Sequence, residues 1–130
     1  MLEGRFSEAI PLFEEAARMF EQLNITFQYA NSRANYWICR VNLDDIDNPE
    51  GLEAELKTLL KILSQSGQWH ERKPLILLAQ IEERRGNIKE AIDLMEQAIK
   101  SCRGSNTLYP EQDVIYLGRL QGKESNYPQG

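Results

Sequence analysis

The chain has 130 residues and a net charge of −5, a length that fits one domain or a short run of repeats and excludes a multidomain enzyme. Hydrophobic residues make up 42% and charged residues 27%, which excludes a disordered chain, and no apolar run is long enough to cross a bilayer. Valine occurs only at Val41 and Val114, while leucine, alanine and glutamate are abundant. This composition favours helices over strands, so we expect an all-α protein.

Apolar residues recur at spacings of three and four along five segments, which is the period of an amphipathic helix. The first segment runs from Gly4 to Leu23 and includes Pro11. The second runs from Phe27 to Val41 and ends at an acidic turn. A third helix is predicted after Asn48, because the succession Asn, Pro, Glu supplies a side-chain cap, a preset backbone angle and a favourable charge at a helix start.

The fourth and fifth helices are predicted from about Glu71 onward. Gly86 and Asn87 permit a tight reversal between them, since glycine adopts left-handed backbone angles without strain. After Arg103 the chain is rich in polar residues, with one further helix at Glu111–Gly122 and a flexible end from Lys123. We therefore divide the chain into a helical repeat domain, 1–103, and a segment with a partial further helix and a flexible tail, 104–130.

An internal repeat is the most informative feature of the sequence. The segments Gly4–Ala16 and Gly86–Ala98 share Gly, an apolar residue, Glu-Ala-Ile, Leu, a large apolar residue, Glu and Ala at matching places, 82 residues apart. Leucine and isoleucine residues in the middle of the chain fit a third, diverged copy. Such a pattern is typical of stacked helix hairpins.

At these positions the sequence resembles the tetratricopeptide repeat family, whose helix pairs alternate small and large apolar residues. The best-matching unit contains Leu75, Leu78, Ala79, Gly86, Ile88, Ala91, Met95 and Ala98. The middle unit departs from the family at Glu55, which replaces a small residue, and at an enlarged turn, 44–48. Val114, Leu117 and Gly118 fit the opening of a further unit. The resemblance implies an α-α superhelix, a right-handed solenoid of antiparallel helix pairs.

The resemblance also implies a function. In that family the first helix of each pair lines a concave groove that binds a peptide or helix of a partner protein. Asn and Gln can bond a peptide backbone, and Lys and Arg can hold a carboxylate. We expect a non-catalytic protein-interaction or scaffold module. Its partner-binding residues, carried over by position, are Ser32, Asn35, Tyr36, Cys39, Asn42, Lys73, Leu77, Gln80 and Arg84.

Two alternatives remain open at this stage. The chain could be a regulatory segment of a larger enzyme or signalling protein, such as a protease or ATPase sensor that carries these repeats. It could also be a self-associating assembly module, because it starts with the second helix of one pair and stops in the first helix of another. That phase leaves apolar helix faces uncovered at both ends and predicts a homo-oligomer.

Residues with catalytic or metal-binding chemistry are few. His70 is the only histidine, with no cysteine at metal-ligand spacing, and phosphate-binding glycine loops are absent. We expect no enzymatic activity, cofactor or metal site. The stretch Asp44–Glu55 holds six acidic residues and no Lys or Arg, which argues against nucleic-acid binding. With no membrane segment or export signal, and with Cys39 and Cys102 as reduced thiols, we expect a cytoplasmic protein.

Overall fold

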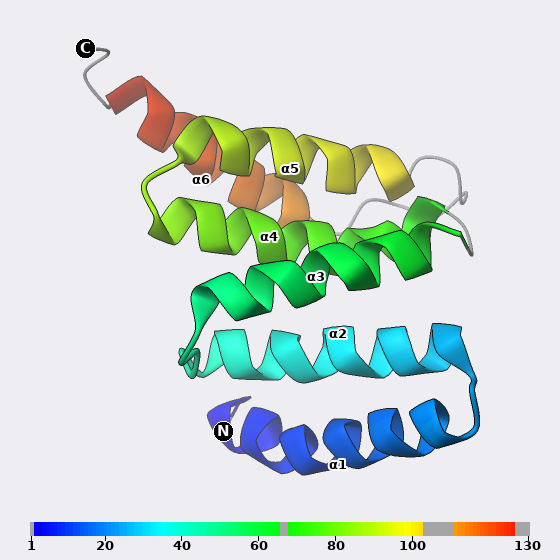
Figure 1. The fold of residues 1–130 in the computed structure, drawn as a ribbon. Helices are drawn as coiled ribbons and strands as arrows, with labels where there is room; N and C mark the ends of the chain where they lie inside the picture. Colours follow the sequence, from blue (N-terminus) through cyan, green and yellow to red (C-terminus); the bar gives the residue numbers. More distant parts are fainter. Residues whose placement is uncertain (1, 66–67, 103–110, 127–130) are drawn as a thin grey trace. The chain divides into compact units, whose positions relative to one another are not determined.

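A computed structural model describes residues 2–65, 68–102 and 111–126 (Figure 1). Within those ranges it contains helices and no strand, so the predicted all-α class is confirmed. The elements are, in chain order, α1 (Leu2–Gln22), α2 (Thr26–Asn42), α3 (Pro49–Ser64), the 3-10 helix η1 (Gln68–Glu71), α4 (Arg72–Arg84), α5 (Ile88–Cys102) and α6 (Glu111–Asn126). None of these helices is both long enough and apolar enough to span a membrane.

The chain divides into two compact units. The first unit, Met1–Gly67, contains α1 to α3, and the second unit, Gln68–Gly130, contains η1 and α4 to α6.

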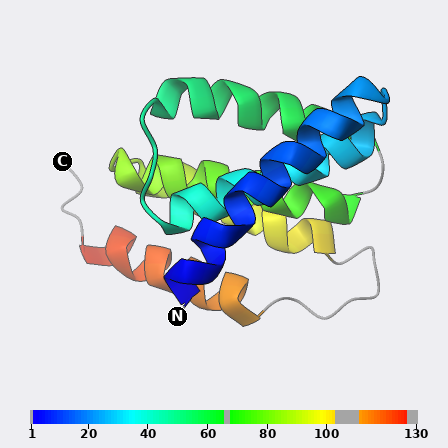
Figure 2. The same ribbon diagram turned by 90° about the horizontal axis from the view of Figure 1, so that it is seen from below.

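In the first unit α1 and α2 form an antiparallel hairpin, and α3 packs on α2 (Figures 1 and 2). The turn between α1 and α2 contains Asn24, whose positive φ of 59° is tolerated best by glycine, asparagine and aspartate. Ala17 of α1 and both Ala30 and Ala34 of α2 are buried. Such small side chains allow helix axes to approach closely.

The start of α3 confirms the predicted cap. The side chain of Asn48 accepts a hydrogen bond from the backbone N–H of Gly51 at 3.2 Å, and Pro49 is the first residue of the helix. These contacts satisfy a donor that the helix itself leaves unpaired. The buried face of α3 consists of four leucines, which are Leu52, Leu56, Leu59 and Leu63.

The second unit is built on the α4–α5 hairpin, with α6 packed along α5 (Figure 1). Gly86 turns the chain with a φ of 85°, as predicted for the reversal before α5. The core cluster of this unit joins one residue of α4 and one of α6 to the predicted apolar face of α5. Its members are Ala79, Ile88, Ala91, Ile92, Met95 and Leu120.

The last helix differs from its prediction. The helix α6 runs to Asn126, so the expected flexible end at Lys123 is wrong for 123–126, while 127–130 and the predicted linker at 104–110 lie outside the described residues. Contacts with α4 explain the extra turn, because Lys123 forms an ion pair with Glu83 and the hydroxyl of Tyr116 donates to the same carboxylate at 2.7 Å.

Candidate functional site

The predicted binding residues on α2 divide into buried and accessible side chains. Ser32, Tyr36 and Cys39 are buried, and Asn35 is half-buried. Asn42 is exposed, and its amide donates to the carbonyl of its own helix at Ile38. Only part of the predicted α2 set is therefore accessible from solvent.

The predicted residues on α4 divide in the same way. Leu77 is buried, Lys73 and Gln80 are half-buried, and Arg84 is exposed. Burial lowers the pKa of Lys73, and the positive charge of Arg72 lowers it further. The Oε1 atom of Gln80 is buried without a hydrogen-bond partner in the described part of the chain.

The most developed side-chain cluster lies on α2, and its central feature is two arginines packed on two aromatic rings. The guanidinium of Arg33 lies 4.5 Å from the ring centre of Tyr36 and 5.4 Å from that of Trp37. The guanidinium of Arg40 lies 5.6 Å and 5.1 Å from the same two rings. The rings themselves meet edge to face at 5.0 Å. Contacts of this kind stabilise a charge on an apolar surface.

Carboxylates complete this cluster. Arg33 donates to Glu55 of α3 through Nε at 2.6 Å and through Nη2 at 2.9 Å. Burial acts to raise the pKa of Glu55, but the hydrogen bonds from Arg33, the indole N–H of Trp37 and the positive charge of Arg33 together outweigh it and leave that pKa below its usual value. Burial acts to lower the pKa of Arg33, but the hydrogen bonds to Glu55 and the charge interactions with Glu55, Tyr29 and Tyr36 together outweigh it, so that pKa rises.

Arg40 connects the cluster to the acidic turn after α2. Its Nη1 donates to the hydroxyl of Tyr36 at 2.8 Å, while Nη2 lies 3.3 Å from Asp45 and 3.7 Å from Asp47. Arg40 of α2 thus supplies a positive charge beside the acidic turn. The cluster was not predicted from the sequence, although the spacing of Arg33, Trp37 and Arg40 on one side of a helix is a signal for it.

The chemistry available at the remaining titratable groups is limited. Burial raises the pKa of the Cys39 thiol, which makes thiolate formation harder. Burial lowers the pKa of His70, and Lys73 adds to the effect. Among the described residues, no group of three or more His, Cys, Asp or Glu side chains is placed to hold a metal ion.

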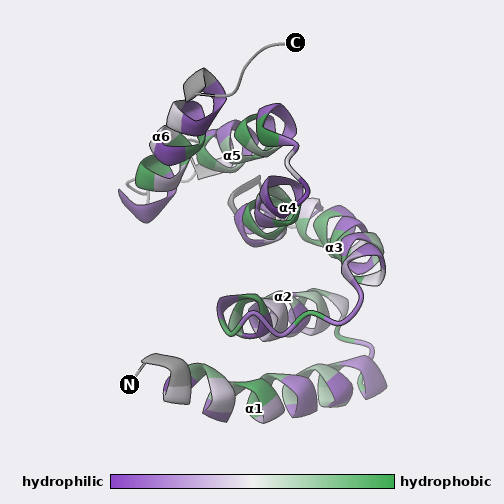
Figure 3. Cartoon of the chain, turned by 90° about the vertical axis from the view of Figure 1, so that its left-hand side faces the viewer, coloured by the Kyte–Doolittle hydropathy of each residue, from purple (hydrophilic) through white to green (hydrophobic). Residues whose placement is uncertain are grey.

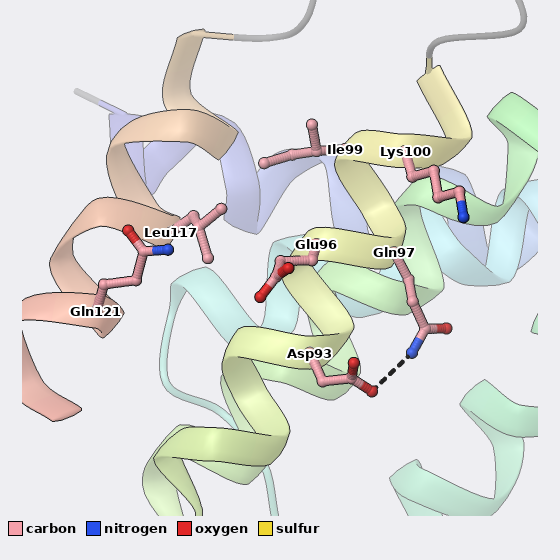
Figure 4. A pocket seen from close by; sticks show the side chains of 7 residues that line it. All are labelled: Asp93, Glu96, Gln97, Ile99, Lys100, Leu117 and Gln121. Atoms are coloured by element: carbon pink, nitrogen blue, oxygen red, sulfur yellow. Dashed lines mark hydrogen bonds between the residues drawn. The ribbon is translucent and has the colours of Figure 1, made fainter.

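A groove between α5 and α6 is a second feature, which was not predicted from the sequence. Its volume is about 450 Å³, and two of its lining side chains are apolar, Ile99 and Leu117 (Figure 4). The polar residues of its wall are Asp93, Glu96, Gln97, Lys100 and Gln121. The pattern of apolar residues in α5 and α6 is the only sequence signal for it.

In the part of the chain that the structure describes, the fold is all-helical and includes the antiparallel hairpins α1–α2 and α4–α5. Comparisons with protein-family models, curated proteins and solved structures gave no match. The resemblance to tetratricopeptide repeats therefore rests on the chain's own repeat.

Proposed function

We propose that this chain is a non-catalytic protein-interaction module of the tetratricopeptide type, a right-handed solenoid of antiparallel helix pairs that binds a partner peptide or helix. The observation that carries the proposal is the repeat segment Gly86–Ala98. Its small residues Ala91 and Ala98 are completely buried in the second unit, as close helix packing in such a repeat requires.

Five of the predicted binding residues reach solvent, and in this proposal they make the direct contacts. Asn35 and Asn42 form a strip on α2, and Lys73, Gln80 and Arg84 form a strip on α4. Asparagine bonds both N–H and C=O groups of a peptide, whereas the two cations attract a carboxylate. The partner is thus a peptide with exposed backbone and at least one acidic group.

The buried members of the predicted set have a supporting role. Tyr36 is held under Arg33 and Arg40 of the same helix, and it is the direct neighbour of Asn35 in the sequence. Cys39 is buried with a raised pKa, which favours a packing role over that of a nucleophile.

The proposal is tested by selecting ligands from a displayed library of peptides with free carboxylates and measuring their affinity by fluorescence anisotropy. Replacing Lys73 or Arg84 by alanine removes a charged hydrogen bond worth about 1.5–3 kcal/mol, so we expect the dissociation constant to rise about tenfold or more. Asn35→Ala should weaken binding less, because its bonds are neutral.

Lys89→Ala is the matched control, since Lys89 is an exposed lysine on α5 outside both strips. Its affinity should equal that of the unchanged chain. If Lys73→Ala, Arg84→Ala and Asn35→Ala all bind the selected peptides as tightly as this control, the assignment of the binding surface is wrong. A library that yields no ligand contradicts the proposal as well.

A further inference from the structure

The helices α1 and α5 carry the same repeat, yet they are buried to different degrees. Five apolar positions of α5 are buried, namely Ile88, Ala91, Ile92, Met95 and Ala98. Their counterparts 82 residues earlier in α1 are each only half-buried, namely Phe6, Ala9, Ile10, Phe13 and Ala16. The apolar side chains of the repeat are therefore less covered in α1 than in α5.

The number of neighbouring helices explains the difference. Within the second unit α5 packs between α4 and α6, whereas within the first unit α1 packs on α2. The uncovered flank of α1 is apolar, because Leu12 is 67%, Met19 54% and Leu23 64% exposed. Leu12 and Met19 are seven positions apart and so share one side of the helix, and Leu23 comes directly after its last residue, Gln22. In α5 the counterpart of Leu12 is Leu94, which packs against the core of the second unit.

The helix α6 also carries apolar positions that are less buried than their counterparts, which in this case lie in α4. Its residues Val114, Leu117 and Gly118 match three positions of α4 that are all buried, Leu75, Leu78 and Ala79. In α6, however, Val114 is 49% exposed, Leu117 is half-buried and Gly118 is exposed. Figure 3 shows the apolar residues of α1 and α6 in green. Among the described residues, α4 has its repeat partner α5, and α6 has none.

The groove between α5 and α6 lies beside this open face of α6. Leu117 of α6 and Ile99 of α5 point toward one another across it (Figure 4). Gln121 lies one turn beyond Leu117 on the same face of α6, and it forms the rest of the α6 wall of the groove. The groove is thus bordered by the face of α6 that corresponds to the partner-facing residues of α4.

We propose that α1 of a second copy of this chain packs on α6, in the groove between α5 and α6, as α5 packs on α4. The occupant is a second copy because α1 carries the α5 repeat and leaves uncovered the flank that α5 buries. The contact joins two different surfaces of the chain, so it is heterologous and extends head to tail from copy to copy. It uses neither of the strips proposed to bind peptides.

Sedimentation equilibrium of the chain 1–130 tests the proposal. The average mass should rise steadily with concentration, as expected for open head-to-tail association. Leu12→Glu, on the α1 flank, and Val114→Glu, on the α6 face, should each weaken association at least tenfold. Glutamate suits both sites, because it places a charge in an apolar contact, and at position 12 it would also approach Asp93 and Glu96 of the groove wall.

A mixture of the two variants gives the sharpest result. Each Leu12→Glu copy keeps an intact α6 face, and each Val114→Glu copy keeps an intact α1 flank. Together they should form a 1:1 dimer and nothing larger, although each alone stays monomeric. Ile115→Glu is the matched control, because Ile115 is 63% exposed but points about 100° away from Val114 around the helix. It should associate like the unchanged chain.

Three results would overturn the proposal: a strictly monomeric chain at millimolar concentration, single variants that each still dimerise, or a mixture that forms no complex. The second result would indicate an interface between identical faces. Circular dichroism establishes that each variant is helical. If Leu12→Glu is unfolded, Met19→Glu replaces it on the same flank, and the same outcomes apply.

Discussion

Arg33 and Glu55 form a two-bond ion pair between α2 and α3, with Nε–Oε2 and Nη2–Oε1 distances of 2.6 and 2.9 Å. Glu55 stands where the repeat pattern has a small residue, and this pair explains how a glutamate is accommodated there. The arginine side chain is 20% and the glutamate side chain 27% exposed, so the pair is partly shielded from water. It belongs to the connections that hold α3 on α2.

Removing one partner of this pair should destabilise the first unit. Arg33→Ala and Glu55→Ala should each lower the free energy of unfolding by about 1–3 kcal/mol, because each leaves a partly buried charge without its partner. The double variant should lose less than the sum of the two single losses. Urea denaturation followed by circular dichroism measures all three. Strict additivity would show that the pair contributes nothing to stability.

The lowered pKa of Glu55 makes stability depend on pH. A carboxylate with a lower pKa in the folded state stabilises the fold above its unfolded pKa of about 4.3, and this contribution is lost as the pH falls through the folded pKa. Urea midpoints between neutral pH and pH 3 should therefore decrease more for the unchanged chain than for Glu55→Gln. The pKa of Glu83 is also lowered, so the urea midpoint of Glu55→Gln should still decrease somewhat as the pH falls. If the urea midpoint falls equally with pH in the unchanged chain and in Glu55→Gln, Glu55 is not a source of the pH dependence.

The Asn48 cap provides a third prediction. Asn48→Ala should lower the free energy of unfolding by about 1 kcal/mol, because the N–H of Gly51 loses its acceptor. Asn48→Asp is the control, since aspartate caps equally well and should keep stability within a few tenths of a kcal/mol. Thermal denaturation compares the three chains. Equal losses in both variants would mean that the side-chain oxygen at position 48 is not what stabilises the helix start.

Local features of the sequence predicted much of the fold. The apolar face of α5, the Asn48 cap and the Gly86 reversal depend on residues within a few positions of each other, and periodicity and turn chemistry describe such short ranges well. Matching residues at matching places also indicated that α1 and α5 carry the same repeat. The class and the order of the helices could therefore be derived without coordinates.

Pairings between distant charges could not be predicted in this way. Arg33 and Glu55 are 22 residues apart, and Arg72 and Asp113, which form a second two-bond pair at 2.7 and 2.9 Å, are 41 apart. A sequence holds many acids and bases, and only the packing of helices decides which of them meet. The same limit applies to the predicted site, since position on a helix did not reveal that Leu77 is buried.

The end of α6 shows this dependence on distant contacts. The hydroxyl of Tyr116 donates to Glu83 of α4, and burial, followed by this hydrogen bond, raises the pKa of Tyr116. Tyr116→Phe keeps the ring but removes the bond, so we expect a loss of about 1 kcal/mol and faster hydrogen exchange in α6. Gln112→Ala, at an exposed position on the same helix, keeps the bond and serves for comparison. Exchange in α6 that is unchanged by Tyr116→Phe would show that the bond does not hold the helix.

Pro11 provides the last prediction, because it lies well inside α1, at the tenth residue of a 21-residue helix. Proline lacks the backbone N–H that would bond to the carbonyl of Ser7, and its ring crowds that carbonyl, at a cost of about 3 kcal/mol relative to alanine in a helix interior. Its side chain is exposed, so replacement removes no core contact. Pro11→Ala should therefore raise the free energy of unfolding by about 1–3 kcal/mol and raise the melting temperature. Glu14→Ala, at an exposed position one turn further along α1, should change both by much less. A melting temperature that falls with Pro11→Ala would mean that a bend at Pro11 is needed for α1 to pack on α2.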